Sequence, residues 1–129
     1  MQQGLILFAH GARDPRWAQP FEQVAARVRG QRPGRPVTLA YLEFMAPDLD
    51  AAGDALAEAG CQRIEVLPLF LGAGGHVRKD LPERLAQLRE RHPAITWTLH
   101  AAAGESERLV QALADIAAET LAMAGPEQA

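Results

Sequence analysis

The centre of this sequence is residues 64–82, which read IEVLPLFLGAGGHVRKDLP. Residues 64–71 are mostly apolar and do not alternate strictly with polar residues, a pattern typical of a strand covered on both faces of a parallel sheet. Three of the next four residues, 72–75, are glycines, which let the backbone turn sharply and approach a ligand closely because they lack a Cβ. His76 follows at once, where an open α/β sheet places its ligand site, just beyond the carboxyl end of a strand. We therefore expect a buried strand that ends in a ligand-binding loop.

Length and composition are typical of one globular domain. The 129 residues are 48% hydrophobic and 22% charged, with a formal net charge of −3. This acidic balance, with no basic tail, argues against a nucleic-acid partner. No apolar run approaches the roughly 20 residues of a membrane-spanning helix, and no basic secretion signal begins the chain. The single cysteine, Cys61, cannot form an internal disulfide. We therefore expect a cytoplasmic protein with one domain over residues 1–129.

Upstream of the centre, strands and helices are predicted to alternate. Residues 5–9 and 37–44 are apolar runs with the length of buried strands. The first helix begins at Asp14-Pro15, a cap followed by proline. The second helix begins at Pro47-Asp48 and ends at Gly60. The apolar faces of the two helices consist of Trp17, Phe21, Val24 and Val28 in the first, and Leu49, Ala52 and Leu56 in the second.

Downstream, a helix follows the glycine loop, and two starting points are possible. Asp80 and Glu83 have the spacing of a capping box, but the helix can also begin nearer His76. A short strand is predicted over residues 96–99, and a long alanine-rich helix over residues 105–124. This alternation predicts an α/β fold with a four-stranded, mostly parallel sheet, helices on both faces and right-handed crossovers.

A polar side chain is predicted at the carboxyl end of each strand. These residues are His10, Glu43, His76 and His100. Because parallel strands end at the same edge of a sheet, we expect all four on one rim. Two histidines and a carboxylate form a partial shell for cobalt, nickel, iron or zinc, with positions open for water or substrate. The alternative is that these side chains only bond loop backbone, since no compact metal motif such as HExxH is present.

Basic side chains flank the predicted rim. Arg13 follows the first strand, and Arg78 and Lys79 follow His76. They would attract an anionic ligand such as a polycarboxylate, or they are solvated surface charges. The glycine loop lacks the GxxxxGK[ST] and GxGxxG patterns of nucleotide sites. A histidine phosphatase carries an arginine directly before its His-Gly pair, and Ala9 at that position argues against this class.

Three blocks of the sequence carry a resemblance to a known family. Residues 9–15 read AHGARDP, residues 41–44 read YLEF and precede Pro47, and residues 67–82 run from LPLFL into GGHV and DLP. Together, and in this order, the blocks resemble the small, single-domain form of the CbiX-type sirohydrochlorin chelatases. The resemblance implies a single CbiX-like domain that forms one half of a two-lobed chelatase. A homodimer would restore the two-lobed shape.

The resemblance also implies an activity, the insertion of a divalent metal ion into sirohydrochlorin. Cobalt leads to cobalamin, iron to sirohaem and nickel to a related tetrapyrrole, and we favour cobalt over iron. The metal is then a substrate (Co²⁺, Fe²⁺ or Ni²⁺), and no other cofactor is implied. By analogy with the family, His10 and His76 hold the metal or take protons from the macrocycle, and Glu43 assists. The residues expected to bind the macrocycle are Arg13, Gly74, Gly75, Arg78 and Lys79.

A second class of function stays open on the sequence alone. A non-catalytic carrier of metal or tetrapyrrole would use the same rim but would stop at one equivalent of product, whereas a chelatase continues. His100 matches the family less securely and is at most an accessory residue. The expected partners are sirohydrochlorin, a divalent metal ion and a second copy of the chain, with no nucleic acid and no membrane.

Overall fold

The computed structural model describes residues 2–72 and 74–124, and for His76 and residues 122–124 it describes the backbone alone. Its centre is a four-stranded sheet in the order β2-β1-β3-β4, in which every neighbouring pair runs parallel. This confirms the predicted α/β fold. The strands are β1 Gln3–Ala9, β2 Val37–Tyr41, β3 Arg63–Pro68 and β4 Thr96–Leu99.

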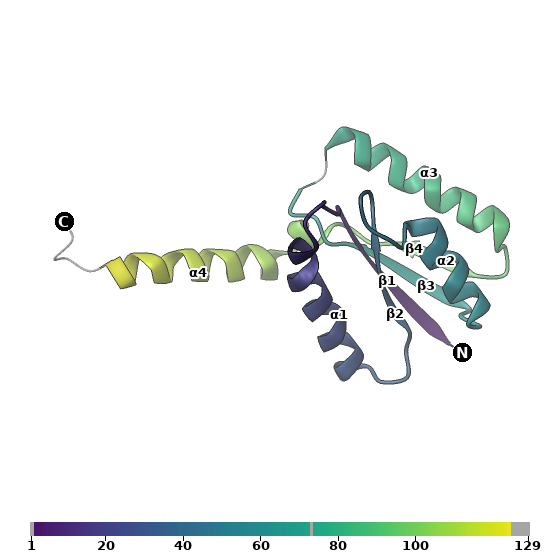
Figure 1. The fold of residues 1–129 in the computed structure, drawn as a ribbon, viewed down its shortest axis with the longest axis horizontal. Coiled ribbons are helices and arrows are strands. Elements are labelled where there is room, and N and C mark those ends of the chain that lie inside the picture. Colours follow the sequence, from purple (N-terminus) through teal and green to yellow (C-terminus); the bar gives the residue numbers. More distant parts are fainter. Residues whose placement is uncertain (1, 73, 125–129) are drawn as a thin grey trace.

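Helices lie on both faces of the sheet, as predicted (Figure 1). α1 packs on one face, and α2 and α3 pack on the other. α4 extends away from the sheet as an arm (Figure 1). No helix in residues 2–72 and 74–124 is both long enough and apolar enough to cross a membrane. The helical segments are η1 Pro15–Ala18, α1 Gln19–Gln31, α2 Leu49–Glu58, α3 Gly75–Arg91, η2 Ala103–Glu105 and α4 Glu107–Ala124.

The two faces of the sheet carry unequal cores. On the α2 and α3 face, Ile6, Ile64 and Val66 are fully buried, each 0% exposed. On the α1 face, Leu7 is buried against α1, while Leu67 on the neighbouring strand is only partly buried. Alternate side chains of a strand point to opposite faces, and β1, β2 and β3 contribute to both cores, whereas β4 contributes to the α2 and α3 face. The α1 face is therefore less completely covered than the opposite one.

Local signals explain the bounds of α2 and the irregular start of α1. Asp48 caps α2 by accepting a hydrogen bond from the Ala51 N–H at 2.8 Å, and Gly60 follows its end with φ +93°. The predicted apolar face of the first helix is wrong at Val24, which is 41% exposed. Ala25 is buried instead. The predicted first helix begins instead with the separate 3₁₀ helix η1, whose tighter winding changes the phase of the residues that follow.

Two predicted strand ends around the centre are wrong, and one of the two predicted starts of the following helix is confirmed. β2 ends at Tyr41 rather than at residue 44, and Phe44 adopts φ +67°, which a strand residue cannot have. β3 ends at Pro68 rather than at residue 71, and Leu71 is 69% exposed in the following loop. α3 begins at Gly75, which confirms the second of the two predicted starting points, the one nearer His76, and Asp80 lies inside the helix rather than at its cap.

Candidate functional site

The carboxyl ends of the strands meet at one edge of the sheet, and the loops that leave this edge form the rim. The strand ends are nearly level, since Ala9 pairs with Tyr41 and Phe8 pairs with Pro68. Each loop therefore starts from a fixed position beside its neighbour. This is the edge at which open parallel sheets bind ligands.

His10 and Glu43 are held together by their backbones. The Glu43 N–H donates to the His10 carbonyl at 3.1 Å, one step beyond the bond from the Leu42 N–H to the Ala9 carbonyl at 2.9 Å. The His10 side chain is exposed at the rim, and its ring lies 5.5 Å from that of Phe70. The structure thus places one imidazole and one exposed carboxylate on adjacent loops, although β2 itself ends before Glu43.

Gly11 makes this close approach possible. Its φ is +90°, a conformation that side-chain-bearing residues rarely adopt. A Cβ added at this position would overlap the Glu43 carbonyl oxygen. The glycine after His10 is therefore a geometric requirement of the rim.

Phe44 is a rim residue that the sequence prediction missed. Its side chain is 56% exposed, and the Arg13 guanidinium carbon lies 4.8 Å from the centre of its ring. Leu71 adds a second exposed apolar side chain to the rim loops. The only sequence signal for Phe44 was its position directly after Glu43. An aromatic surface with a cation stacked on it suits a flat, anionic ligand.

His100 has a partner on the face of the sheet. Its Nε2 atom lies 2.9 Å from Oε1 of Glu65 on β3, and Gln3 donates to Oε2 of the same carboxylate at 3.2 Å. Burial raises the pKa of Glu65, but the two hydrogen bonds and the nearby positive charges of His100 and Arg63 outweigh it and lower the pKa. This position favours the hydrogen-bonding role for His100 over a ligand role.

The start of α3 is electropositive. Gly74 is the N-cap residue, and the first turn of α3 contains no acidic residue. The unpaired N–H groups of a helix N-terminus attract anions, and Arg78 and Lys79 are exposed nearby. A pocket between this turn and the ends of β3 and β4 is lined in part by Arg78. The His76 backbone lies in the same turn, and its side chain lies outside the described part of the structure.

The side chains that the structure describes include no group of three His, Cys, Asp or Glu residues that could hold a metal ion together. The His76 side chain is not among the described ones, so the expected metal-binding set of His10, Glu43 and His76 stays a prediction. Cys61 is buried in the core, and burial raises the pKa of its thiol, so it offers no thiolate to the rim. The rim therefore presents nitrogen and oxygen donors.

Comparison with known proteins identifies relatives over nearly the whole chain. The family model described as CbiX matches residues 4–120. A sirohydrochlorin cobaltochelatase from Sulfolobus acidocaldarius is 28% identical over 122 residues, which are 95% of each protein. A sirohydrochlorin ferrochelatase from Bacillus subtilis is 26% identical over 88% of this chain, which spans only 43% of that relative. The crystal structure of a cobalamin biosynthesis CbiX protein from Marinobacter aquaeolei has a TM-score of 0.82 at 34% identity, over 94% of this chain and 98% of that one.

Proposed function

Because the chain belongs to the CbiX family, we propose that it is a sirohydrochlorin chelatase, an enzyme that inserts divalent cobalt or iron into sirohydrochlorin. The observation that carries this proposal is the exposed His10 ring beside the Glu43 loop at the carboxyl edge of a parallel sheet. Relatives named for cobalt and for iron both match the chain, and nickel suits the same donors.

The metal is a substrate, so the rim must bind it and then release it. The proposed ligands are His10, Glu43 and His76, which supply imidazole nitrogen and carboxylate oxygen. Such donors suit first-row divalent ions, whereas thiolates would hold them more tightly. An exposed shell also leaves positions open for the water that the ion must shed and for the pyrrole nitrogens that replace it.

Two protons must leave for each metal ion that enters the ring. The metal forms bonds to the four ring nitrogens while two pyrrole N–H bonds break, so one M²⁺ is exchanged for two H⁺. A neutral imidazole accepts a proton near pH 7, and His10 or His76 fills this role in the proposal. The exposure of His10 lets its proton pass on to water.

The rest of the rim binds the macrocycle. Sirohydrochlorin carries carboxylates around its edge, and Arg13, Arg78 and Lys79 supply positive charge on the loops that carry the histidines. Phe44 offers an exposed ring against which a flat molecule can lie. Gly74 and Gly75 allow close approach to the backbone at the start of α3.

The proposed enzyme is a single CbiX-like domain that acts as a homodimer in the cytoplasm. The chain spans about half of the Bacillus subtilis ferrochelatase, and a second copy would supply the remaining half of such a shape. A two-fold axis would then bring two identical rims to one cleft.

The test is multiple-turnover metal insertion, followed by visible absorbance with sirohydrochlorin in large excess over protein. Cobalt, iron, nickel and zinc are compared in separate reactions. The chain should form many equivalents of product, and His10→Ala should lower the rate about 100-fold or more, since acid–base groups contribute this much. His92→Ala is the matched control, because His92 pairs with Asp54 at 2.7 Å on a helix end away from the rim loops.

Two results would contradict the proposal. Product that stops at one equivalent would identify a carrier rather than an enzyme. Full turnover in a folded His10→Ala variant would remove His10 from the mechanism.

A further inference from the structure

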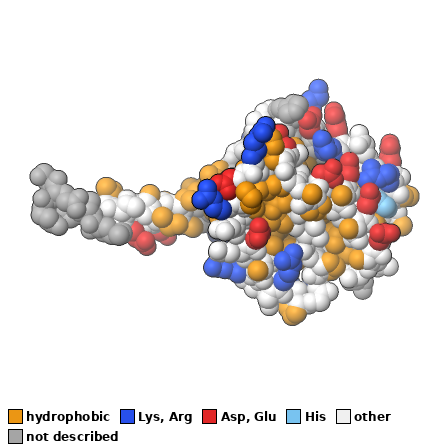
Figure 2. All heavy atoms as spheres, viewed as in Figure 1, with side chains coloured by type: hydrophobic (Ala, Val, Ile, Leu, Met, Phe, Trp, Pro, Cys, Tyr) orange, Lys and Arg blue, Asp and Glu red, His pale blue; other side chains and the backbone are white. Residues whose placement is uncertain are grey.

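α4 carries an apolar face that the described part of the chain leaves exposed. Its 18 residues extend about 27 Å, at about 1.5 Å per residue, as an arm that points away from the sheet (Figure 1). Figure 2 shows hydrophobic side chains along the arm as well as on the body of the protein. The large apolar side chains exposed on α4 are Val110 (48%), Leu113 (45%), Ile116 (59%) and Leu121 (77%).

These side chains are arranged as a stripe. At 100° per residue they form one broad face that runs from Ile116 through Leu113 to Val110 and Leu121, and the charged residues after Arg108, namely Asp115 and Glu119, lie on the remaining side of the helix. An amphipathic helix of this length gains most of its stability by burying its apolar face. α4 therefore requires a surface to cover it.

A largely apolar surface that can receive α4 lies on the α1 face of the sheet. We call it the open face, and it consists of Leu5, Glu65, Leu67 and Leu69. All four side chains are only partly buried, whereas Ile64 and Val66 on the opposite face are fully buried. Among the described residues, α1 covers the β1 and β2 side of this face, and no helix covers the β3 and β4 side.

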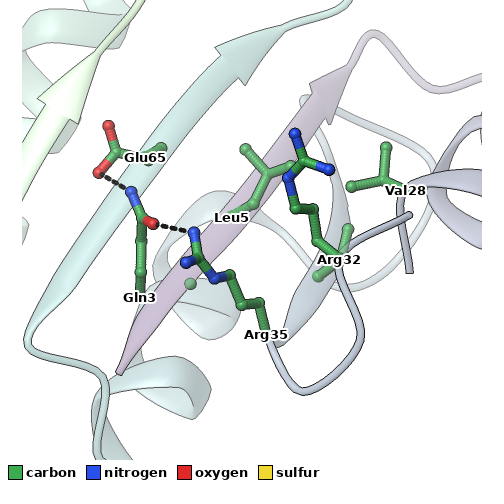
Figure 3. Close-up of a pocket in the computed structure, with 8 residues that line it drawn as sticks. Gln3, Leu5, Val28, Arg32, Arg35 and Glu65 are labelled. Carbon is green, nitrogen blue, oxygen red and sulfur yellow. Dashed lines mark hydrogen bonds between the residues drawn. The ribbon is translucent and has the colours of Figure 1, made fainter. Parts of the chain in front are cut away.

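Pockets mark both ends of the open face. The pocket near the amino ends of the strands is lined by Leu5 and Glu65 and carries Arg32 and Arg35 at its border (Figure 3). Arg35 donates to Gln3 at 2.6 Å, and Gln3 donates to Glu65 at 3.2 Å. The pocket at the other end lies between Leu67 and the base of α4.

The junction between η2 and α4 directs the arm away from its own sheet. The Gly104 N–H donates to the Phe70 carbonyl at 2.8 Å, and a Cβ at Gly104 would overlap the Leu71 backbone, so η2 is packed tightly in place. Only Ser106, in an extended conformation, separates η2 from α4. The Ser106 backbone alone therefore sets the angle between η2 and α4, and in this conformation α4 points away from the sheet (Figure 1).

Surface area favours a second copy of the chain as the occupant. The accessible surface of 8352 Å² exceeds the roughly 6,700 Å² of a compact monomer of this mass. The excess is comparable with what a subunit buries in a standard or larger interface.

We propose that α4 is an exchanged arm: in a homodimer its apolar face packs on the open face of the second copy, and the second copy's arm does the same in return. The roughly 27 Å helix is long enough to cover the roughly 20 Å of β3. This inference rests on the homodimer proposed above, and it is independent of the metal chemistry.

The test measures assembly by sedimentation and light scattering over a range of protein concentrations. The parent chain should be a dimer of twice its 14.0 kDa mass. Ile116→Asp and Leu67→Asp should each raise the dimer dissociation constant about 30-fold or more, as loss of a central interface residue does. Ala118→Asp is the matched control, because it adds the same charge on the polar side of α4 and should change the constant less than about threefold.

Mixing the two variants separates arm exchange from simple pairing of two arms. A mixture of Ile116→Asp and Leu67→Asp retains one intact arm and one intact open face, so it should form more dimer than either variant alone. Circular dichroism establishes that each variant is folded. If Leu67→Asp does not fold, hydrogen exchange decides: the α4 amides of the parent should be protected in the dimer and exposed on dilution.

Two results would overturn the inference. A dimer that Ile116→Asp leaves intact would show another interface, while the homodimer itself would stand. A parent that is monomeric at every concentration, with protected α4 amides, would show that the arm folds back on its own sheet. Neither result bears on the proposed metal insertion, which is tested by the separate turnover assay.

Discussion

Replacement of Gly11 by alanine tests the geometry that joins His10 to Glu43. Two costs add at this position. A left-handed φ of +90° costs a side-chain-bearing residue about 1–2 kcal/mol. The new Cβ also overlaps the Glu43 carbonyl oxygen, so the loops must separate and weaken the 3.1 Å bond from Glu43 to His10, worth about 1 kcal/mol. The free energy of unfolding should therefore fall by about 2–3 kcal/mol.

Gly34→Ala is the control for the first of these costs. Gly34 has a similar φ of +86°, but among the described residues its Cβ would meet nothing within 4 Å. It should lose only about 1–2 kcal/mol. Thermal unfolding measures both variants, and about 1 kcal/mol corresponds to about 3–4 °C for a chain of this size. Turnover at saturating sirohydrochlorin should fall in Gly11→Ala and stay near the parent value in Gly34→Ala. Equal melting temperatures and equal turnover for the two variants would refute the argument.

Two further predictions concern stability away from the rim. Gly53→Ala places a Cβ 2.8 Å from Cδ2 of Leu88, so the overpacking cost of about 1–3 kcal/mol should exceed the roughly 1 kcal/mol that alanine gains in helix propensity. Denaturant unfolding should therefore show a lower free energy of unfolding than in the parent. A higher value would mean that Leu88 moves aside at little cost. Asp54→Asn should be less stable than the parent at pH 7 by under about 1 kcal/mol, because the hydrogen bond with His92 lowers the pKa of the half-exposed Asp54. A carboxyl group whose pKa is lower in the folded state stabilises that state fully when the pH is above its unfolded pKa, near 4. The stabilisation is lost as the pH falls through the folded pKa. The stability difference between Asp54→Asn and the parent should therefore shrink below about pH 4. A difference that stays constant down to pH 2 would contradict this.

The sequence predicts most of the fold because the deciding signals are local. Asp48 before a helical period and Gly60 after it fix α2, and His92-Pro93 ends the preceding helix shortly before the short apolar strand β4. Alternation of strands and helices then leaves a parallel sheet as the simplest arrangement. These features require no knowledge of distant contacts.

The boundaries that were predicted wrongly depend on contacts between distant segments. Phe44 leaves the strand with a left-handed φ beside the His10 loop, and nothing in its residue type announces that conformation. Leu71 leaves the sheet where Gly104 packs against its backbone, more than thirty residues later in the chain. Apolar runs mark strands well but do not show where a strand leaves its sheet.

The candidate site was predictable only at the level of backbone position. The ends of parallel strands placed His10 beside the Glu43 loop correctly. The same argument could not show that the His100 side chain engages Glu65 on β3, because side-chain direction depends on which partner lies within reach. Phe44 was missed for a related reason, since its exposure follows from its unusual φ.

The Phe70 ring makes the nuclear magnetic resonance signals of His10 sensitive to the geometry of the rim. Its ring lies 5.5 Å from that of His10 and 5.8 Å from that of Phe8, and its carbonyl accepts the Gly104 hydrogen bond. The ring current of Phe70 therefore acts on the imidazole protons of His10, and small changes in the tilt between the two rings change their resonance frequencies. The chain contains only four histidines, so the His10 signal can be resolved without labelling the whole protein. One aromatic contact thus lets nuclear magnetic resonance follow the rim while the protein works.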